Sequence, residues 1–273
     1  MIIHLATGSS DGVEMSIIAA NIAKREFHGL VSYWYFNSKD KMDRLRKYMP
    51  KARLIMADSG AYSAYTQGAE IDIARYADWL IQYQDVFSVM VSLDVKVSWR
   101  QGQENFLYLR GRGLDVLPVF HISEPGGLLR EMCQEFDYVG LGGVGRLPSD
   151  GVLISNLIEC FKVGQEYGSR FHFFGMTRIK VLMSFDWRSV DSTSWMQGGI
   201  YGITPRYDAF KGLKSCKTAH DKRHYIEQLQ KRYSGLKQWQ DEYKPKEYQL
   251  QEVAGALAYI ELEQRLTERH SND

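Results

Sequence analysis

Cysteine is scarce in this sequence, and the three residues present, Cys133, Cys160 and Cys216, lie far apart in the chain. An odd and scattered set excludes a disulfide framework of the kind that stabilises small secreted domains. It also lacks the paired Cys-x-x-Cys ligands of a structural zinc site. We therefore expect reduced thiols and a cytoplasmic protein, and we predict neither a metal nor another cofactor.

Long apolar runs are also missing, and none approaches the roughly 20 residues of a membrane-spanning helix. The N-terminal segment MIIHLATGSSDG has no basic n-region and no cleavage site, so we expect neither a signal peptide nor a membrane partner. The net charge is only +1, so any surface that binds nucleic acid must be local. The length of 273 residues and the hydrophobic content of 44 % suit one large globular domain.

Short apolar runs alternate along the chain with amphipathic stretches such as residues 71–84, whose apolar residues recur at helical spacing. The runs that we interpret as strands are 2–7, 31–36, 53–58, 88–94, 116–122, 138–143, 171–176 and 187–192. Eight strands alternating with helices predict an α/β fold, a (β/α)8 TIM barrel, over residues 1–200. A doubly wound open sheet is the alternative, and the last strand has little apolar content.

The composition changes after residue 200. Residues 206–246 contain 11 Lys or Arg residues and 5 Asp or Glu residues, with Tyr and Trp between them. We interpret residues 201–246 as a basic, aromatic-rich insertion that contacts the phosphates of a nucleic acid, although a solvated helical face has the same pattern. Its candidate phosphate contacts are Arg206, Lys211, Lys214, Lys222, Arg223, Lys231 and Arg232, and its candidate stacking residues are Tyr207, Tyr233 and Trp239.

Residues 247–273 carry an apolar stripe at Leu250, Val253, Leu257 and Ile260. This spacing predicts a C-terminal helix that packs on the barrel. The chain would then form a single domain overall, a barrel with a basic C-terminal helical extension.

Polar residues cluster at the predicted carboxyl ends of the strands, which face the active-site mouth in a (β/α)8 barrel. They are Thr7, Asp58, Asp94, His121, Gly142, Gly143, Gly175 and Asp191. Asp and Gly also form the turns that follow strands, so each residue alone has a structural explanation. Together, the acids, the histidine and the glycine pair indicate a catalytic site.

The order of these motifs resembles the tRNA-guanine transglycosylase superfamily over residues 53–195. The matching stretches are DSGAY (58–62), VMVSLD (89–94), VFHISEPGG (119–127), YVGLGGVG (138–145), FHFFGMTRIKVL (171–182) and SVDSTSW (189–195). The tRNA enzymes also carry a zinc subdomain with a cysteine cluster, where this chain has only Cys216. The segment DSTSWMQGG lacks the Pro-Thr-Arg run that follows their nucleophile.

The chain therefore looks most like the zinc-free, DNA-acting 7-deazaguanine branch found in phages and bacteria. This resemblance implies DNA as the partner and a base such as 7-cyano-7-deazaguanine as the substrate. It is compatible with a homodimer and, for a phage-encoded protein, with the host cytoplasm. The same exchange on RNA is the alternative.

Base exchange breaks one N-glycosidic bond and makes another at the same sugar carbon, so it needs a nucleophile and a proton donor, as in retaining glycosidases. By the resemblance, Asp191 is the nucleophile and Asp58 is the general acid and base. Asp58 then requires a raised pKa to hold a proton at neutral pH. Helix capping is the structural alternative for both residues.

The resemblance also implies a pocket for the base, in which Asp94 accepts hydrogen bonds from the donor edge of guanine. The other candidate substrate-binding residues are Ser59, Tyr62, His121, Gly142, Gly143, Val144 and Phe174. Two different functions remain open at this point. His4, His121 and His172 with an acid would suit a metal-dependent barrel hydrolase, and a barrel that binds nucleic acid without catalysis is the third reading.

Overall fold

The computed structural model describes residues 1–48, 52–95, 98–143, 149–176, 178–208 and 212–270. Within them, short parallel strands form one sheet in the spatial order β5-β4-β3-β2-β1-β9-β8-β7-β6. These strands are β1 (Ile2–Thr7), β2 (Phe27–Ser32), β3 (Ala52–Asp58), β4 (Val89–Val91), β5 (Val116–Leu117), β6 (Val119–His121), β7 (Tyr138–Gly142), β8 (Arg170–Phe173) and β9 (Ser189–Ser192).

The sheet closes into a barrel at Pro118. Strand β5 pairs with β4 and strand β6 pairs with β7, and only Pro118 separates the two. Proline has no N–H to donate, so it interrupts the ladder, while its carbonyl oxygen still accepts from the N–H of Gly140 at 2.8 Å. Taken together, β5 and β6 act as one strand, and the chain is a (β/α)8 barrel.

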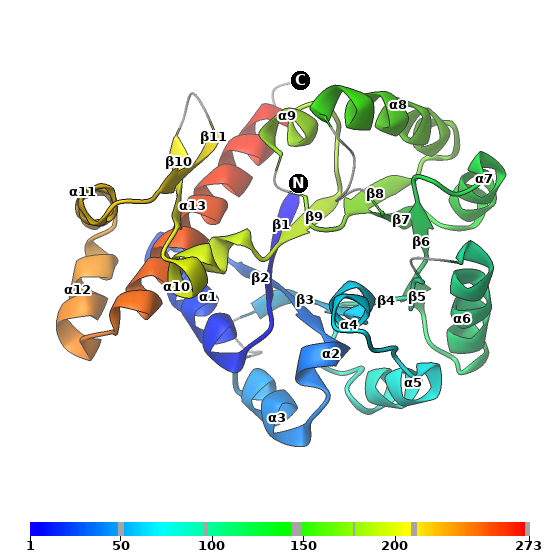
Figure 1. Ribbon diagram of the computed structural model, residues 1–273, viewed down its shortest axis with the longest axis horizontal. Helices are drawn as coiled ribbons and strands as arrows, with labels where there is room; N and C mark the ends of the chain where they lie inside the picture. The colour runs from blue at the N-terminus through cyan, green and yellow to red at the C-terminus, as the bar shows by residue number, and fades with distance from the viewer. Residues whose placement is uncertain (49–51, 96–97, 144–148, 177, 209–211, 271–273) are drawn as a thin grey trace.

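Helices surround the barrel (Figure 1). They are α1 (Ser10–Ala23), α2 (Tyr33–Phe36), α3 (Lys39–Tyr48), α4 (Ala61–Thr66), α5 (Ile73–Gln82), α6 (Trp99–Gly111), α7 (Gly126–Glu135), α8 (Asp150–Tyr167) and α9 (Ile179–Leu182). Side chains of Ser9, Asp72, Ser98 and Ser149 accept N–H groups at the starts of α1, α5, α6 and α8. None of the described helices combines the length and apolar composition needed to cross a bilayer.

The strands separate two apolar cores. Inside the barrel, Ala6, Leu30, Met56, Val91 and Leu117 form a small cluster. The larger core lies between the outer faces of the strands and the helices, and it includes the fully buried Trp187 and Trp195. Because side chains alternate between the two faces of a strand, strands such as β1, β2 and β3 contribute to both cores.

The last barrel helix comes from the C-terminal part of the chain. After β9 the chain forms a short 3-10 helix (Ser194–Met196), α10 (Gln197–Tyr201), a hairpin of β10 (Thr204–Asp208) and β11 (Gly212–Cys216), then α11 (Ala219–Arg232) and α12 (Ser234–Tyr243). Helix α13 (Glu247–His270) then packs beside α1 and β1 (Figure 1). The segment between β9 and α13 is called the basic lobe below.

The predicted barrel is confirmed, and the eight predicted strands are found with one misplaced. The run 31–36 was predicted as a strand, but β2 lies at Phe27–Ser32 and Tyr33–Phe36 is helical. Its aromatic residues resemble a strand in sequence, yet Tyr33 packs against Tyr76 and Trp79 in the outer core. The true strand contains a histidine and a glycine, which lowered its apparent β-propensity.

Helix α13 approaches the 3-10 helix closely at a glycine in the barrel wall. A Cβ atom on Gly255 would lie 2.1 Å from the carbonyl oxygen of Trp195. The indole N–H of Trp195 donates to the carbonyl oxygen of Ala6 at 2.9 Å, so this residue cannot move away without disturbing β1.

Alanine favours a helix by about 1 kcal/mol over glycine, but we expect the clash to outweigh this gain. Gly255→Ala should therefore lower the free energy of unfolding, by a net amount of about 1–3 kcal/mol. Gly111→Ala is the matched control, because a Cβ there meets nothing within 4 Å. Thermal and urea unfolding followed by circular dichroism measure both variants. An unchanged midpoint for Gly255→Ala would contradict the packing described.

Candidate active site

Four of the predicted residues meet at the carboxyl-end mouth of the barrel. Asp58 ends β3, His121 ends β6, Asp191 lies in β9, and Asp94 follows β4. The charges of Asp94 and Asp191 both act on Asp58, and His121 bonds to Asp94. The fold therefore brings together residues that are as many as 133 positions apart in the sequence.

Asp58 is half-buried, and its carboxyl is held by two donors. The N–H of Gly60 donates to Oδ2 at 2.9 Å and the hydroxyl of Ser32 at 3.3 Å. Burial, the charge of Asp94 and the charge of Asp191 raise the pKa of Asp58 to about 7, against the smaller opposing effect of these hydrogen bonds. A carboxyl with this pKa can both give and take a proton near neutral pH.

Asp94 forms one end of a hydrogen-bonded group with His121 and Glu124. His121 Nε2 lies 2.8 Å from Asp94 Oδ2, and the backbone N–H of His121 donates to Glu124 Oε2 at 3.0 Å. Burial lowers the pKa of His121, but the hydrogen bond and charge of Asp94 and the charge of Glu124 outweigh it, so the net pKa is raised. Asp94 Oδ1 makes no hydrogen bond within the described parts of the chain, which leaves it available to a ligand.

Glu124 was missed by the sequence analysis. Its side chain is largely buried, and burial raises its pKa. In the sequence, Glu124 is an acid three residues after His121, which ends a strand. An acid at this spacing can accept a hydrogen bond from the backbone of the turn.

Asp191 is buried, and its Oδ1 atom accepts from the backbone N–H of Gly175 at 2.8 Å. His172 Nε2 lies 3.4 Å from the same oxygen. On the other side of the imidazole ring, Nδ1 lies 2.6 Å from the hydroxyl of Ser189, which lies 2.6 Å from the hydroxyl of Tyr138. Asp191 therefore lies next to a series of polar side chains inside the barrel, formed by His172, Ser189 and Tyr138.

The remaining predicted pocket residues differ in how exposed they are to solvent. Tyr62 is 68 % exposed on α4, where a ligand can reach it, whereas Ser59 is fully buried and accepts from the N–H of Ala61. Phe174 is half-buried beside His172, with ring centroids 4.4 Å apart. The structure thus brings Tyr62 to the surface but not Ser59.

The glycine pair at the end of β7 has a packing role beside His121. A Cβ atom on Gly142 would lie 2.6 Å from the imidazole ring of His121. This glycine therefore leaves the space that His121 occupies beside Asp94. Gly143 is exposed, and Val144 lies outside the described residues.

The histidines proposed for a metal do not converge. The rings of His4 and His172 are 5.9 Å apart, but His121 is bonded to Asp94. Across the described ranges, no group of three or more His, Cys, Asp or Glu residues is arranged to hold a metal ion. The metal-dependent hydrolase reading finds no ligand set among these residues.

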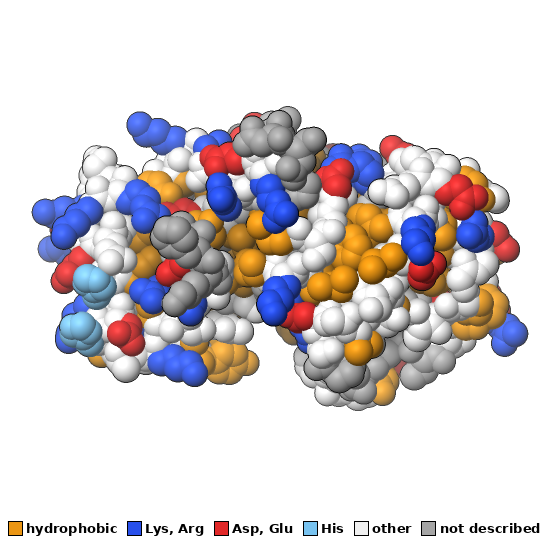
Figure 2. Space-filling model, turned by 90° about the horizontal axis from the view of Figure 1, so that it is seen from above, with side chains coloured by type: hydrophobic (Ala, Val, Ile, Leu, Met, Phe, Trp, Pro, Cys, Tyr) orange, Lys and Arg blue, Asp and Glu red, His pale blue; other side chains and the backbone are white. Residues whose placement is uncertain are grey.

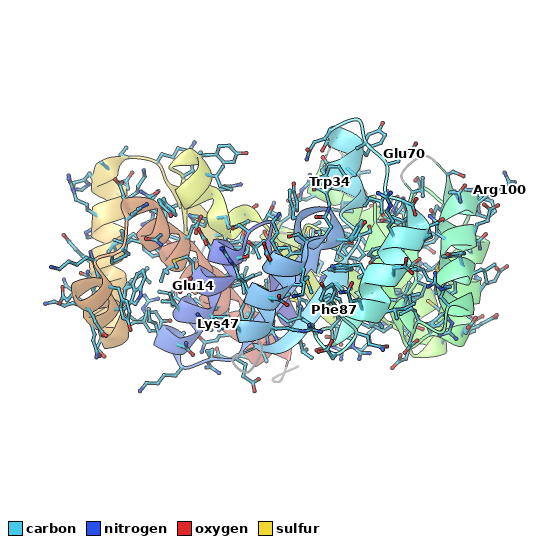
Figure 3. The ribbon with its side chains drawn as sticks, turned by 90° about the horizontal axis from the view of Figure 1, so that it is seen from below. Glu14, Trp34, Lys47, Glu70, Phe87 and Arg100 are labelled. Carbon is cyan, nitrogen blue, oxygen red and sulfur yellow. The ribbon has the colours of Figure 1, made fainter. Side chains whose placement is uncertain are left out.

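The basic lobe presents most of its predicted cations to solvent. Lys214, Arg223 and Lys231 are exposed, and Arg206 and Lys222 are half-buried. Figure 2 shows basic side chains over this lobe and a hollow at the lower edge of the molecule, between the side that carries the lobe and the opposite side of the barrel. Helices α10 and α4, which follow the strands of Asp191 and Asp58, stand on either side of that hollow (Figure 3).

Some of the predicted contact residues in this lobe also pack against the barrel. Arg232 forms an ion pair with the buried Glu261 of α13, and the hydroxyl of Tyr233 donates to the same carboxylate at 3.0 Å. Tyr207 and Trp239 pack against the large core. These residues attach the lobe to the barrel, while Lys211 lies outside the described residues.

The raised pKa of Asp58 predicts a pH-dependent stability. The folded state binds this proton more tightly than the unfolded state, whose pKa is about 3.8. The stabilisation is therefore complete below about pH 4 and disappears as the pH rises through about 7. Relative to Asp58→Asn, the free energy of unfolding of the wild type should fall by about 2–4 kcal/mol over this range.

Urea unfolding of both proteins at several pH values measures this difference. Glu252 and Glu263, whose pKa values burial also raises to about 7, titrate in both proteins and cancel. Parallel curves of stability against pH for the two proteins would show that Asp58 carries no such shift.

No family model matches this chain, and no curated protein matches it in sequence. Among solved structures, it resembles a protein from Coccidioides immitis named as a fructose-1,6-biphosphate aldolase, with a TM-score of 0.55 and 11 % identity over 95 % of this chain and 88 % of that chain. It also resembles tryptophan synthase subunit alpha from Campylobacter jejuni, with a TM-score of 0.43 and 8 % identity over 71 % of this chain and 86 % of that chain.

A third similar structure is macrophomate synthase, with a TM-score of 0.45 and 10 % identity over 74 % of this chain and 82 % of that chain. At such low identities the first likeness shows the fold alone, and the two with lower TM-scores add nothing to it. The chain is a (β/α)8 barrel, and its fold is similar to that of the first of these structures.

Proposed function

We propose that this chain is a transglycosylase that exchanges a guanine base in DNA for a 7-deazaguanine derivative through a covalent bond between Asp191 and the sugar. The observation that carries the proposal is the placement of two unlike carboxyl groups at one barrel mouth. Asp58 has a pKa of about 7, while Asp191 is fixed by the N–H of Gly175. A division of labour between two carboxyl groups is what exchange with a covalent intermediate requires.

In the first half of the reaction, a carboxylate oxygen of Asp191 attacks the C1′ carbon of the sugar. The C1′–N bond breaks, its electron pair goes to the guanine, and Asp58 gives that base a proton. In the second half, a nitrogen of the incoming base attacks C1′ and the C1′–O bond breaks. The electron pair returns to Asp191 and the proton of the incoming base goes to Asp58, which restores the starting state.

Base selection falls to Asp94 in this proposal. A carboxylate is acceptor-only, and the guanine edge offers an N–H and an amino group as donors. Its Oδ2 atom is held by His121, so the carboxylate is oriented before a base binds. Guanine and 7-deazaguanines share this donor edge, so one pocket can serve the leaving and the entering base.

A base inside a duplex cannot reach carboxyl groups at a barrel mouth, so the nucleotide must be flipped out or supplied single-stranded. The hollow between α4 and α10 is the surface proposed to receive the strand (Figures 2 and 3). Lys214, Lys222, Arg223 and Lys231 then contact phosphates. Tyr62, on the opposite side of the hollow, is exposed for stacking on a base.

The test is incubation of the protein with DNA and 7-cyano-7-deazaguanine, followed by mass spectrometry of the digested nucleosides. A parallel incubation with RNA addresses the alternative acceptor. A 7-deazaguanine nucleoside in the DNA digest is expected. Modification of RNA alone would replace DNA by RNA in the proposal, and no exchange into either polymer with any 7-deazaguanine would overturn it.

Asp191→Asn should abolish both exchange and the covalent adduct between protein and DNA, because an amide oxygen is a poor nucleophile and a poor leaving group. Denaturing gels with labelled DNA measure the adduct, and circular dichroism checks the fold. Asp78→Asn is the control, because Asp78 is an exposed acid paired with Arg112. Full exchange in a folded Asp191→Asn variant would rule out Asp191 as the nucleophile.

Lys222→Glu combined with Arg223→Glu should weaken DNA binding and reduce its salt dependence. The slope of log affinity against log salt is expected to fall by about 1 for each phosphate that the variant no longer neutralises. The choice of 7-deazaguanine at saturating DNA should stay the same, because phosphate contacts position the strand and the pocket selects the base. Fluorescence anisotropy over a salt series measures the slope.

The control for these charge reversals is Lys39→Glu with Lys162→Glu, which changes the net charge equally at two exposed sites outside the basic lobe. This pair should leave the slope close to that of the wild type. If both double variants have the wild-type slope, the basic lobe is a solvated face and does not bind the phosphates.

A further inference from the structure

A row of polar side chains runs through the barrel interior beneath Asp191. It starts at Tyr138, whose ring lies under the guanidinium of Arg188 at 4.2 Å, and continues through Ser189 to His172. Ser189 is 1 % exposed and His172 is 0 % exposed. Polar groups in such a place are costly unless they are paired in a defined arrangement, which is a reason to ask what the row supports.

The carboxylate of Asp191 determines which group donates and which accepts in each hydrogen bond of the row. An ionised carboxylate only accepts, so the imidazole nitrogen that faces Asp191, Nε2 of His172, must carry a proton to interact favourably with it. In the neutral ring Nδ1 is then the acceptor, and the Ser189 hydroxyl donates to it at 2.6 Å. The Tyr138 hydroxyl in turn donates to Ser189, so that every donor points toward Asp191.

We infer that His172 is a positioning residue for the nucleophile, and that it acts with the N–H of Gly175 to hold Asp191 Oδ1 so that Oδ2 is the atom that attacks the sugar. This inference rests on the proposed function. Both nitrogens lie near the same oxygen: Gly175 N donates to it at 2.8 Å, and His172 Nε2 lies 3.4 Å from it. The second carboxylate oxygen is thereby left for bond formation.

His172 Nε2 and Asp191 Oδ1 are close but do not form a hydrogen bond. Their separation of 3.4 Å is longer than an ordinary hydrogen bond, and Nε2 has no hydrogen-bond partner among the described residues. Hydrogen bonds in active sites are often long without substrate and shorten in the reacting complex. A small rotation of the Asp191 carboxyl toward C1′ would let the buried N–H find its acceptor.

This contact should matter most when the covalent intermediate breaks down. During attack, Oδ2 gives a lone pair to C1′ and Oδ1 becomes the carbonyl oxygen of an ester, so it loses charge. When the incoming base displaces Asp191, the C1′–Oδ2 bond breaks and the electron pair returns to the carboxylate. Charge then grows on Oδ1, where the donors of His172 and Gly175 stabilise it.

Ser189, His172 and Asp191 have the composition of a serine-hydrolase triad, but the order of exposure is reversed. The serine is buried beneath the histidine, and the aspartate is the member nearest the barrel mouth. A substrate at the mouth meets the carboxylate first, so the serine serves to fix the imidazole tautomer.

The experiment measures exchange turnover and the steady-state fraction of protein held as DNA adduct. In His172→Leu, turnover should fall about 10- to 100-fold, as expected for removal of one hydrogen bond to a charged group, while the adduct fraction should rise above that of the wild type. His172→Gln keeps an N–H donor and should recover part of the turnover. Ser189→Ala should shift both quantities in the same direction as His172→Leu.

Met56→Leu is the matched control, because Met56 is fully buried in the same barrel interior and belongs to its apolar cluster. It should keep the wild-type turnover and adduct fraction. A general loss of barrel packing would lower turnover without raising the adduct fraction, which separates a positioning role from a merely structural one.

The tautomer of His172 provides a second measurement that needs no loss-of-function variant. Nitrogen-15 NMR of the histidine-labelled wild-type chain should show the proton on Nε2. A resting Nδ1–H tautomer, or an unchanged or lower adduct fraction in both His172→Leu and Ser189→Ala, would overturn the inference alone. Absence of any adduct in the wild type would overturn the proposed function, and the inference with it.

Discussion

The burial of Asp58 beside two other carboxyl groups at the barrel mouth is the constraint on which the rest of the site depends. Burial raises the pKa of Asp58, and the charges of Asp94 and Asp191 raise it further. Each acid is accommodated in a different way. His121 pairs with Asp94, the N–H of Gly175 holds Asp191, and Asp58 retains a proton up to about neutral pH. Three aspartates thereby differ in their hydrogen-bond partners, and Asp58 differs in its raised pKa.

Much of the fold and part of the site could be predicted from the sequence, because barrel strands are short apolar runs that end at a common mouth. This rule alone was enough to place Asp58, Asp94, His121 and Asp191 together. The strand β2 was misplaced because the choice between 27–32 and 31–36 is decided by packing of aromatic rings on α5. Local composition does not carry that information.

The supporting residues were harder to find. Glu124 contacts His121 through the local turn, and Ser189 contacts His172 only because β8 and β9 pair in the barrel. Gly142 is predicted as a ligand contact, and the structure shows that it also leaves space for the His121 ring. A glycine in sequence reveals that space is needed, but it does not reveal which group fills that space.

The position of α13 has a consequence for how the protein is made. Strand β1 pairs with β9, and α13 covers β1 beside α1, so a strand that is synthesised before every other barrel element is completed by a helix that is synthesised after all of them. Contacts of such long sequence separation make folding slow. Until α13 has been synthesised, β1 lacks part of its outer cover, and its apolar residues stay partly exposed. The barrel wall closes over β1 only after α13 has been made.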